Sequence, residues 1–252
     1  METKNTVTAA QLKEALIELG VEPGMTLEVH CSLSSFGRLE GGAMTVIDTL
    51  KETVTGQGSI FMPALRLSRE LELTEEDRRL GITVKIKILP PGTQRTAMGI
   101  VADTFRCLPD TLCGDGVIST AGWGRYAQEA VNSGLDQAVF HGGKALLLGV
   151  DIYKLTAMHY VEDVTPPEIG GMFAPGEEIN KVYPPEEWMI EAGHPPVKAW
   201  YTVQRLAFGR GLIREMYIGP CRAMFFDIHD VVSIYRGELI RDPYGLWGLP
   251  RP

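Results

Sequence analysis

Two residues near the middle of the chain, His159 and Glu162, have the types and the spacing needed to move protons at a substrate. They follow an apolar run, residues 144–150, that is typical of a strand buried on both faces of an α/β sheet. Thr156 can cap a helix there, and residues three apart on a helix share one face, so the carboxylate can reach the imidazole. Because reactive groups in open α/β sheets lie beyond the carboxyl ends of the strands, the pair is a candidate general base with its orienting carboxylate. A surface helix without a catalytic role can carry the same spacing.

A second set of candidate residues lies at the end of the first expected strand and in the loop after it. His30 ends that strand, either as a further catalytic group facing the same crevice or as a histidine satisfied inside the sheet, and the sequence leaves both open. The backbone N–H groups of Ser32, Leu33 and Ser34 can stabilise the negative charge that develops on a carbonyl oxygen, as an oxyanion hole does. Cys31 beside His30 invites a thiol nucleophile, but adjacent strand residues point to opposite faces, which disfavours that pairing.

The elements that must position these groups alternate between helical and extended patterns, which predicts an α/β fold. Helical spacing of apolar residues predicts helices over residues 8–19, 41–54, 98–107, 122–131 and 227–235. Apolar runs predict buried strands over residues 26–31, 59–63 and 144–150. Residues 201–207 and 215–218 are expected to pair as antiparallel strands. A strand, a helix and a strand in that order are typical of a parallel βαβ unit.

Two segments interrupt this pattern and are expected to lie over the site as insertions within a single domain, residues 1–252. Residues 64–95 are irregular and charged, and residues 165–200 contain Pro-Pro pairs, which regular structure does not tolerate throughout. Acidic residues gather around the second segment, where they form either a site for a polycationic ligand or a solvated face. They are Glu162, Asp163, Glu168, Glu177 and Glu178.

The composition narrows the class of protein. Of 252 residues, 44% are hydrophobic and 22% are charged, as in an ordinary globular protein. The net charge of −8 argues against nucleic acid, whose phosphates require a basic surface, and suits a neutral or cationic small molecule. The apolar runs are too short for a membrane helix, and the first residues are too polar for a signal peptide, so a cytoplasmic location without membrane contact is expected. The four cysteines form no metal-ligand or disulfide pattern, so no metal is expected.

Several segments, in order along the chain, resemble the aminoglycoside 3-N-acetyltransferase family. Residues 19–37, with Val29-His30-Cys31-Ser32-Leu33-Ser34 near their end, are similar to the family's Gly-x-x-x-Gly-Asp-x-x-x-Val-His-Ser-Ser-Leu-Ser-x-x-Gly pattern. Further similar segments lie at residues 41–50, 58–63, 95–99, 119–127, 144–162 and 219–224. The resemblance covers residues 8–235, and the order of its motifs makes it specific.

The resemblance implies a three-layer α/β/α sandwich with a central mostly parallel or mixed sheet. It also implies that acetyl coenzyme A is the donor and that a primary amine of an aminoglycoside-like, cationic small molecule is the acceptor. His159 would act as the general base and Glu162 would orient it. A homodimer is compatible with the sequence. The residues expected to contact the donor are Cys31, Ser32, Leu33, Ser34, Arg95 and Thr96.

The chain departs from the family pattern near the expected site. Residues 112–116 lack the family's Arg-Ser-x-His-Pro run, the loop over residues 135–142 is short, and the usual asparagine before Thr156 is absent. Two alternatives to acetyl transfer therefore stay open, since a fold can be kept while its site changes. One is a biosynthetic enzyme that performs acid/base or acyl chemistry on another small metabolite without acetyl coenzyme A. The other is a binding protein without catalysis.

Overall fold

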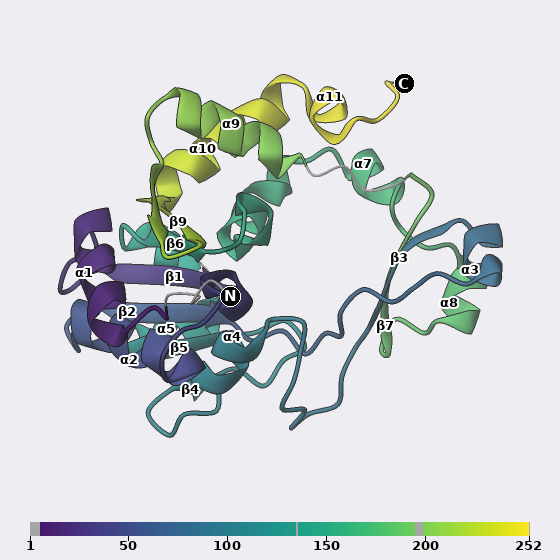
Figure 1. Ribbon diagram of the computed structural model, residues 1–252. Coiled ribbons are helices and arrows are strands. Elements are labelled where there is room, and N and C mark those ends of the chain that lie inside the picture. Colours follow the sequence, from purple (N-terminus) through teal and green to yellow (C-terminus); the bar gives the residue numbers. More distant parts are fainter. Residues whose placement is uncertain (1–5, 135, 195–198, 252) are drawn as a thin grey trace, which may run out of the picture.

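A seven-stranded sheet forms the centre of the computed structural model, which describes residues 6–134, 136–194 and 199–251 (Figure 1). Its strands are β1 Thr26–Cys31, β2 Ser59–Pro63, β4 Leu112–Cys113, β5 Thr120–Gly124, β6 Lys144–Leu148, β8 Arg214–Ile218 and β9 Cys221–Asp227. They lie in the order β4-β5-β2-β1-β6-β9-β8. β1 is parallel to both β2 and β6, whereas β5 and β9 run antiparallel to their neighbours β2 and β6. The parallel unit over residues 26–63 is confirmed, and the sheet as a whole is mixed.

Helices cover both faces of the sheet, which confirms the expected three-layer α/β/α architecture. One face carries α1 Ala9–Leu19, α2 Gly42–Val54 and α4 Ile100–Phe105. The other face carries α5 Ala127–Ser133, α6 Asp136–Phe140, α9 Trp200–Gly209, α10 Ile228–Arg241 and the 3-10 helix η3 Thr156–Val164. Shorter elements are η1 Leu33–Phe36, η2 Ile152–Lys154, α7 Pro167–Gly171 and α11 Pro243–Trp247.

The central strand β1 serves both layers because its residues alternate between the two faces. Leu27 and Val29 are buried in the hydrophobic core under α1, α2 and α4. Glu28 and His30 are also buried, but they lie on the opposite face, where they meet the first residues of η3. Buried polar side chains require hydrogen-bond partners, so this face of β1 must be matched by polar groups of the layer above it.

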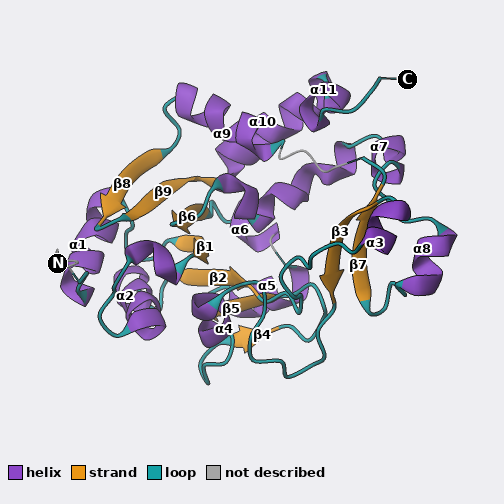
Figure 2. Ribbon diagram, turned by 45° about the vertical axis from the view of Figure 1, so that its right-hand side comes forward, coloured by secondary structure: helices purple, strands orange, loops and turns teal. Residues whose placement is uncertain are grey.

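A second, two-stranded sheet stands beside the main body (Figures 1 and 2). Its antiparallel strands are β3 Ile82–Lys87 and β7 Trp188–Ala192, and the helices α3 Glu75–Arg79 and α8 Glu177–Val182 flank it. The two strands come from the segments 64–95 and 165–200, which were expected to be irregular. The expectation of irregular chain is wrong at these strands, because each one is completed only by the other.

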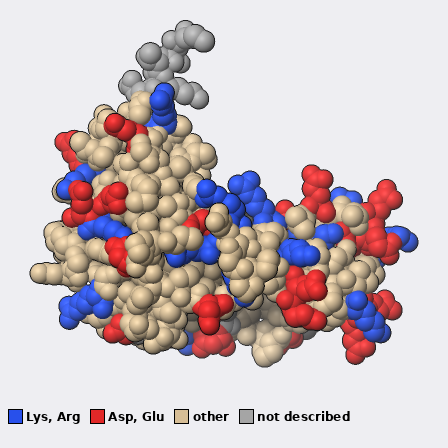
Figure 3. Space-filling model, turned by 90° about the horizontal axis from the view of Figure 1, so that it is seen from below, with Lys and Arg blue, Asp and Glu red and all other residues tan. Residues whose placement is uncertain are grey.

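Charged side chains of both signs crowd the outer surface of this small unit, at the right of Figure 3. Both of its helices have acidic residues in the first turn and basic residues in the last turn. That order complements the helix dipole, which is positive at the amino end and negative at the carboxyl end. The outer surface of the unit is therefore suited to solvent, and its opposite side is left to face the main body.

A buried ion pair holds the small unit together. Asp77 of α3 is fully buried and accepts hydrogen bonds at 2.5 Å from both the Lys85 ammonium of β3 and the Tyr183 hydroxyl. Burial opposes the charge on Asp77, but these bonds and those from Thr74 outweigh it and hold the pKa of the carboxyl well below its usual range. The same contacts raise the pKa of Lys85, so both groups stay charged at neutral pH.

The expected helix over residues 122–131 is wrong in its first half. Residues up to Gly124 belong to β5, and the helix α5 begins at Ala127. Gly124 has a φ of 93°, and a Cβ at this position would come within 2.2 Å of the carbonyl oxygen of Gly58. Only glycine lets the end of β5 lie this close to the chain entering β2, a constraint that helical periodicity does not register.

The expected strand over residues 201–207 is also wrong, because this segment is the helix α9. Val203 and Ala207, four residues apart, are its buried residues and lie on one helical face. Residues 215–218 are indeed extended, in β8, but their partner is β9. The expected helix over residues 227–235 is confirmed and longer, with Asp227 as its N-cap. The tail holds a further short helix, α11.

The ion pair of the small unit gives a stability prediction. Lys85→Met leaves the Asp77 carboxylate buried without its counter-charge, so we expect a loss at the lower end of the roughly 3–5 kcal/mol that such breakage costs. Urea unfolding at pH 7 together with hydrogen exchange of the β3 and β7 amides measures it. Lys13→Met is the matched control, because the Lys13–Glu52 pair is exposed and should contribute little. Equal effects of the two substitutions would contradict the assignment.

Candidate active site

His159 lies on η3, and its exposed side chain lines a cavity of about 830 Å³. Its ring meets the ring of Trp200 on α9 edge-to-face, with the centroids 4.8 Å apart. A 3-10 helix has three residues per turn, so residues three apart are aligned on one face. Position 162 therefore shares the face of His159. The side chain of Glu162 lies outside what the structure describes, and the predicted pairing stays a prediction.

Two parts of the molecule line this cavity. One side consists of η2, η3, α7, α9 and α11, and the other consists of the small sheet and the chain before it (Figure 2). The first side contributes aromatic surface from Tyr153, Phe173, Trp200 and Trp247. The second side contributes Glu70, Val84, Ile86 and Glu191. Both segments that interrupt the α/β pattern thus supply residues to the cavity that His159 lines.

Two carboxylates face the cavity from the small unit. Glu191 belongs to β7, and Glu70 lies in the exposed segment before α3. Burial, and then the negative charge of Glu70, raises the pKa of the Glu191 carboxyl. The Oε2 atom of Glu191 is buried and has no hydrogen-bond partner among the described residues. A cationic ligand in the cavity would relieve the repulsion between the two carboxylates.

Three further polar atoms of the cavity wall are buried without a hydrogen-bond partner in the part of the chain that the structure describes. They are the indole N–H groups of Trp200 and Trp247 and the hydroxyl of Thr165. Unpartnered buried polar groups are rare in folded proteins and cost stability. The residues that carry these atoms line the cavity, although the atoms themselves are covered by the surrounding protein.

His30 is almost fully buried behind this wall and does not line the cavity. Its Nε2 lies 2.7 Å from Oε1 of the buried Glu28, two residues earlier on the same face of β1. The same oxygen accepts the backbone N–H groups of Thr156 at 2.8 Å and Ala157 at 3.2 Å. η3 is therefore capped by Glu28 from the sheet, whereas the sequence predicted a cap by the side chain of Thr156.

The turn after β1 is the 3-10 helix η1. The N–H of Ser32 donates to the carbonyl of Leu148 on β6 at 2.9 Å, and the hydroxyls of Ser32 and Ser34 lie 3.2 Å apart. The first N–H groups of η1, from Leu33 and Ser34, have no acceptor within their own helix. Burial raises the pKa of the Cys31 thiol well above its usual value, so this cysteine stays protonated and is unsuited to be a nucleophile.

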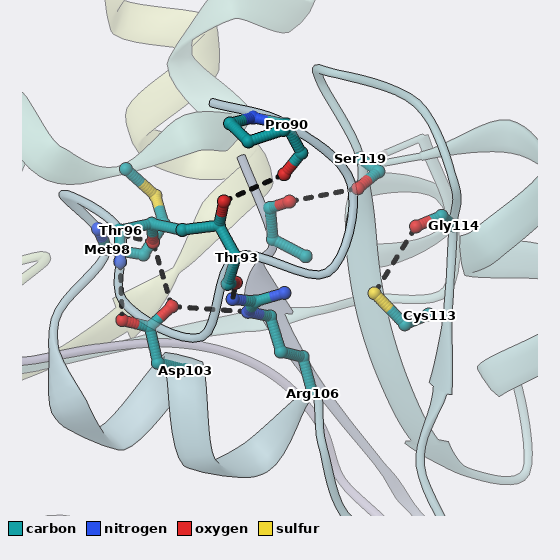
Figure 4. Close-up of polar contacts among 10 residues, drawn as sticks. Pro90, Thr93, Thr96, Met98, Asp103, Arg106, Cys113, Gly114 and Ser119 are labelled. Carbon is teal, nitrogen blue, oxygen red and sulfur yellow. Dashed lines mark hydrogen bonds and ion pairs between the residues drawn. The ribbon is translucent and has the colours of Figure 1, made fainter. Parts of the chain in front are cut away.

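The loop that carries Arg95 and Thr96 is tied to α4, as Figure 4 shows. The buried Asp103 carboxylate accepts both the N–H and the hydroxyl of Thr96 at 2.8 Å, and it accepts Nε of Arg106 at 3.2 Å. Arg106 also donates to the carbonyl of Thr93. The Thr96 hydroxyl is therefore used within the loop, where it fixes the backbone that presents Arg95.

The same loop lies beside the end of β1. Gly99, which precedes α4, has a φ of 89°, and a Cβ there would be 3.9 Å from the carbonyl oxygen of Cys31. The two segments predicted to contact the donor, residues 31–34 and 95–96, are thus neighbours in the fold. Neither segment is among the residues that line the cavity of His159.

The acidic cluster expected around residues 162–178 does not line this cavity within the described ranges of the chain. Asp163 pairs with Arg236 at 3.5 Å, and Glu168 accepts the Tyr244 hydroxyl at 3.2 Å. Among the side chains that the structure describes, the carboxylates that line the cavity are those of Glu70 and Glu191. The sequence did not single them out, because their proximity depends on the pairing of β3 with β7.

Comparison with known proteins agrees with this architecture. A model of the aminoglycoside 3-N-acetyltransferase family matches residues 29–236. The chain belongs to this family. A relative, the SPbeta prophage-derived aminoglycoside N(3')-acetyltransferase-like protein YokD of Bacillus subtilis (strain 168), is 29% identical over 181 residues. That alignment covers 62% of this chain and 64% of YokD, so the match spans less than two thirds of the relative.

Two solved structures share the fold at low sequence identity. The complex of AAC-IIIb with CoASH matches with a TM-score of 0.68 and 20% identity, over 98% of this chain and 100% of that chain. A histidine-to-alanine mutant of the aminoglycoside acetyltransferase AAC(3)-IVa in complex with a gentamicin matches with a TM-score of 0.72 and 21% identity. The latter match covers 100% of this chain and 94% of that chain.

Two negative findings hold for the described residues. Within residues 6–134, 136–194 and 199–251, no helix is both long and apolar enough to cross a membrane. In the same part of the chain, no group of three or more His, Cys, Asp or Glu side chains is arranged to hold a metal ion.

The raised pKa of Glu191 predicts that the ionised carboxylate lowers the stability of the folded protein at neutral pH. The folded state holds this proton more tightly than the unfolded state, so the ionised carboxylate costs stability as the pH rises above about 4.3, the usual value for glutamate. Glu191→Gln should therefore raise the thermal unfolding midpoint at pH 7 and leave it unchanged near pH 3.5. Glu187→Gln, at an exposed position in the turn that precedes β7, is the control. A midpoint lowered at pH 7 would contradict the prediction.

Proposed function

We propose that this protein transfers the acetyl group of acetyl coenzyme A to a primary amine of an aminoglycoside-like polycation, with His159 as the general base. One observation carries the proposal: a single cavity is lined by His159 on one side and by the carboxylates of Glu70 and Glu191 on the other. Membership of the family and the coenzyme A and gentamicin complexes of its structural neighbours support it.

The cavity suits an acceptor that is both cationic and rich in hydroxyl groups. Glu70 and Glu191 can bind ammonium groups, and the net charge of −8 attracts a polycation from a distance. The aromatic side chains of Trp200 and Trp247 line the cavity and can pack against the apolar side of a sugar ring.

The chemistry follows from the position of His159 beside the bound amine. An ammonium group must first release one proton to the solvent before its nitrogen can attack, and a neutral imidazole is suited to accept the second proton, which the nitrogen loses as it attacks. The amine nitrogen then forms a bond to the thioester carbonyl carbon, and the nitrogen gives its proton to His159. The carbon–sulfur bond breaks, the thiolate takes the proton from the imidazolium, and the products are an N-acetyl amide and free coenzyme A. The edge-to-face contact with Trp200 holds the ring, and Glu162 is proposed to orient it.

The donor is proposed to bind along the neighbouring segments at the end of β1. The first N–H groups of η1, from Leu33 and Ser34, are suited to the negative charge that develops on the carbonyl oxygen. Arg95 is suited to a phosphate of coenzyme A, and its loop is held by the contacts of Thr96 with Asp103.

Substitution of the proposed base gives a direct test. His159→Ala should lower kcat for acetylation of gentamicin by about 10²–10⁴-fold, the usual contribution of a general base, while the Kd for acetyl coenzyme A stays unchanged. Release of the coenzyme A thiol measures turnover, and titration calorimetry measures binding. His229→Ala is the matched control, because His229 is an exposed histidine on α10 that does not line the cavity.

Two results would overturn the proposal. Wild-type protein that neither binds acetyl coenzyme A nor releases its thiol with any aminoglycoside would favour the biosynthetic alternative, in which another metabolite is the substrate. Full activity of His159→Ala would retain the acetyl transfer but remove this histidine from it.

A further inference from the structure

The carboxylate of Glu28 is buried in the centre of the main sheet, where a charge is least expected. Glu28 is 0% exposed and lies in the middle of β1, whose register pairs it with Phe61 of β2 and Ala145 of β6. Burying a charged group is costly unless other groups compensate it. Its Oε2 atom has no hydrogen-bond partner among the described residues, so the compensation is incomplete. An apolar side chain would fill this position at less cost, which indicates that the charge has a task.

The hydrogen bonds of the Glu28 carboxylate converge on one oxygen atom and serve one element. Oε1 lies 2.7 Å from Nε2 of His30, 2.8 Å from the N–H of Thr156 and 3.2 Å from the N–H of Ala157. Thr156 and Ala157 are the first two residues of η3, whose leading N–H groups have no acceptor within the helix. A negative charge at the amino end of a helix is also favoured by its dipole.

η3 depends on these hydrogen bonds to the sheet more than an α-helix of the same length would. It is a 3-10 helix of nine residues, whereas runs longer than three or four residues are uncommon because the hydrogen-bond geometry is poorer. His159 lies one turn beyond Thr156 and faces the cavity, while Met158 and Val161 are buried in the core beneath. A shift of the first turn of η3 would therefore move the imidazole relative to the cavity.

We infer that Glu28 is a positioning residue for His159: it fixes the first turn of η3 to the sheet, and His30 completes this clamp. The clamp consists of Glu28, His30 and the N–H groups of Thr156 and Ala157. The inference rests on the proposed function only in taking His159 as the base. We assign the proton to Nε2 of His30, because an ionised Glu28 carboxylate can only accept a hydrogen bond, so His30 orients the carboxylate from behind the cavity wall.

The test is Glu28→Gln, which keeps the size of the side chain and one acceptor oxygen but removes the charge. With acetyl coenzyme A and gentamicin, we expect kcat to fall by about 10–100-fold, as displaced catalytic groups typically cause. The KM for acetyl coenzyme A should stay within about twofold, because a lost positioning contact acts on the chemical step. In NMR spectra of histidine-labelled protein, the ring signals of His159, identified by their loss in His159→Ala, should shift, whereas those of His229 should not.

A second variant tests the clamp from its other side. Thr156→Pro removes one N–H donor and leaves the strand and the charge intact. Proline is tolerated at the first position of a helix, and Leu155 before it has φ −68° and ψ 110°, a conformation compatible with a following proline. It should shift the His159 signals and lower kcat in the same direction. Asp227→Asn is the control, because Asp227 caps α10 beside Lys144, at the opposite end of β6 from the site.

The outcomes separate this inference from the proposed function. A Glu28→Gln protein with kcat within about twofold of wild type and unchanged His159 signals overturns the clamp. If wild-type protein shows no acetyl transfer, the proposed function fails, and the His159 signals alone decide the inference. If Glu28→Gln does not fold, Thr156→Pro decides it by the same readouts. An equal loss of kcat in Asp227→Asn would also overturn it.

Discussion

The hydrogen bonds between the Glu28 carboxylate and the first N–H groups of η3 join the main sheet to the helix that carries the proposed base, His159. The parallel strands supply a rigid floor, since β1 is paired on both sides and almost entirely buried. η3 carries the histidine, but as a long 3-10 helix it has little stability of its own. Because the first turn of η3 is hydrogen-bonded to β1, the imidazole of His159 can keep a defined position although η3 itself is not a stable helix.

The cavity depends on a second constraint, the pairing of two distant strands. β3 and β7 are about a hundred positions apart along the chain, yet together they place Glu191 and Val84 opposite the helices that surround His159. The buried pair of Asp77 with Lys85 fixes the far side of this thin sheet. One face of β3 is therefore committed to holding the unit together, and the other face to lining the cavity. The small unit is too small to be stabilised by its core of four buried residues alone, which explains the charged contacts.

Local signals allowed much of the fold to be predicted from the sequence. The capping box of Thr8 and Gln11 begins α1, and apolar runs mark β1, β2 and β6, because these features depend on neighbouring residues only. β3, β7 and α9 were missed or misassigned because their state is decided by distant partners. In the site, His159 was found from its spacing to Glu162, whereas Glu70 and Glu191 come together only after the small sheet has formed. Glu28 did leave a signal: it is a charged residue between Leu27 and Val29 in a buried strand, on the same face as His30.

Several buried polar groups that lower the folding stability of this protein belong to residues at or near the candidate active site. The partly unsatisfied carboxylates of Glu28 and Glu191, and the indoles of Trp200 and Trp247 that lack a partner among the described residues, all lie on or directly behind the wall of one cavity. Selection for stability alone would replace such groups with apolar ones, as it has done in the layer beneath α1 and α2, where the sheet residues are hydrophobic. The two faces of the same sheet thus follow different rules. One face is apolar, whereas the other, although mostly apolar too, retains Glu28 and His30, the two residues that we infer to position His159.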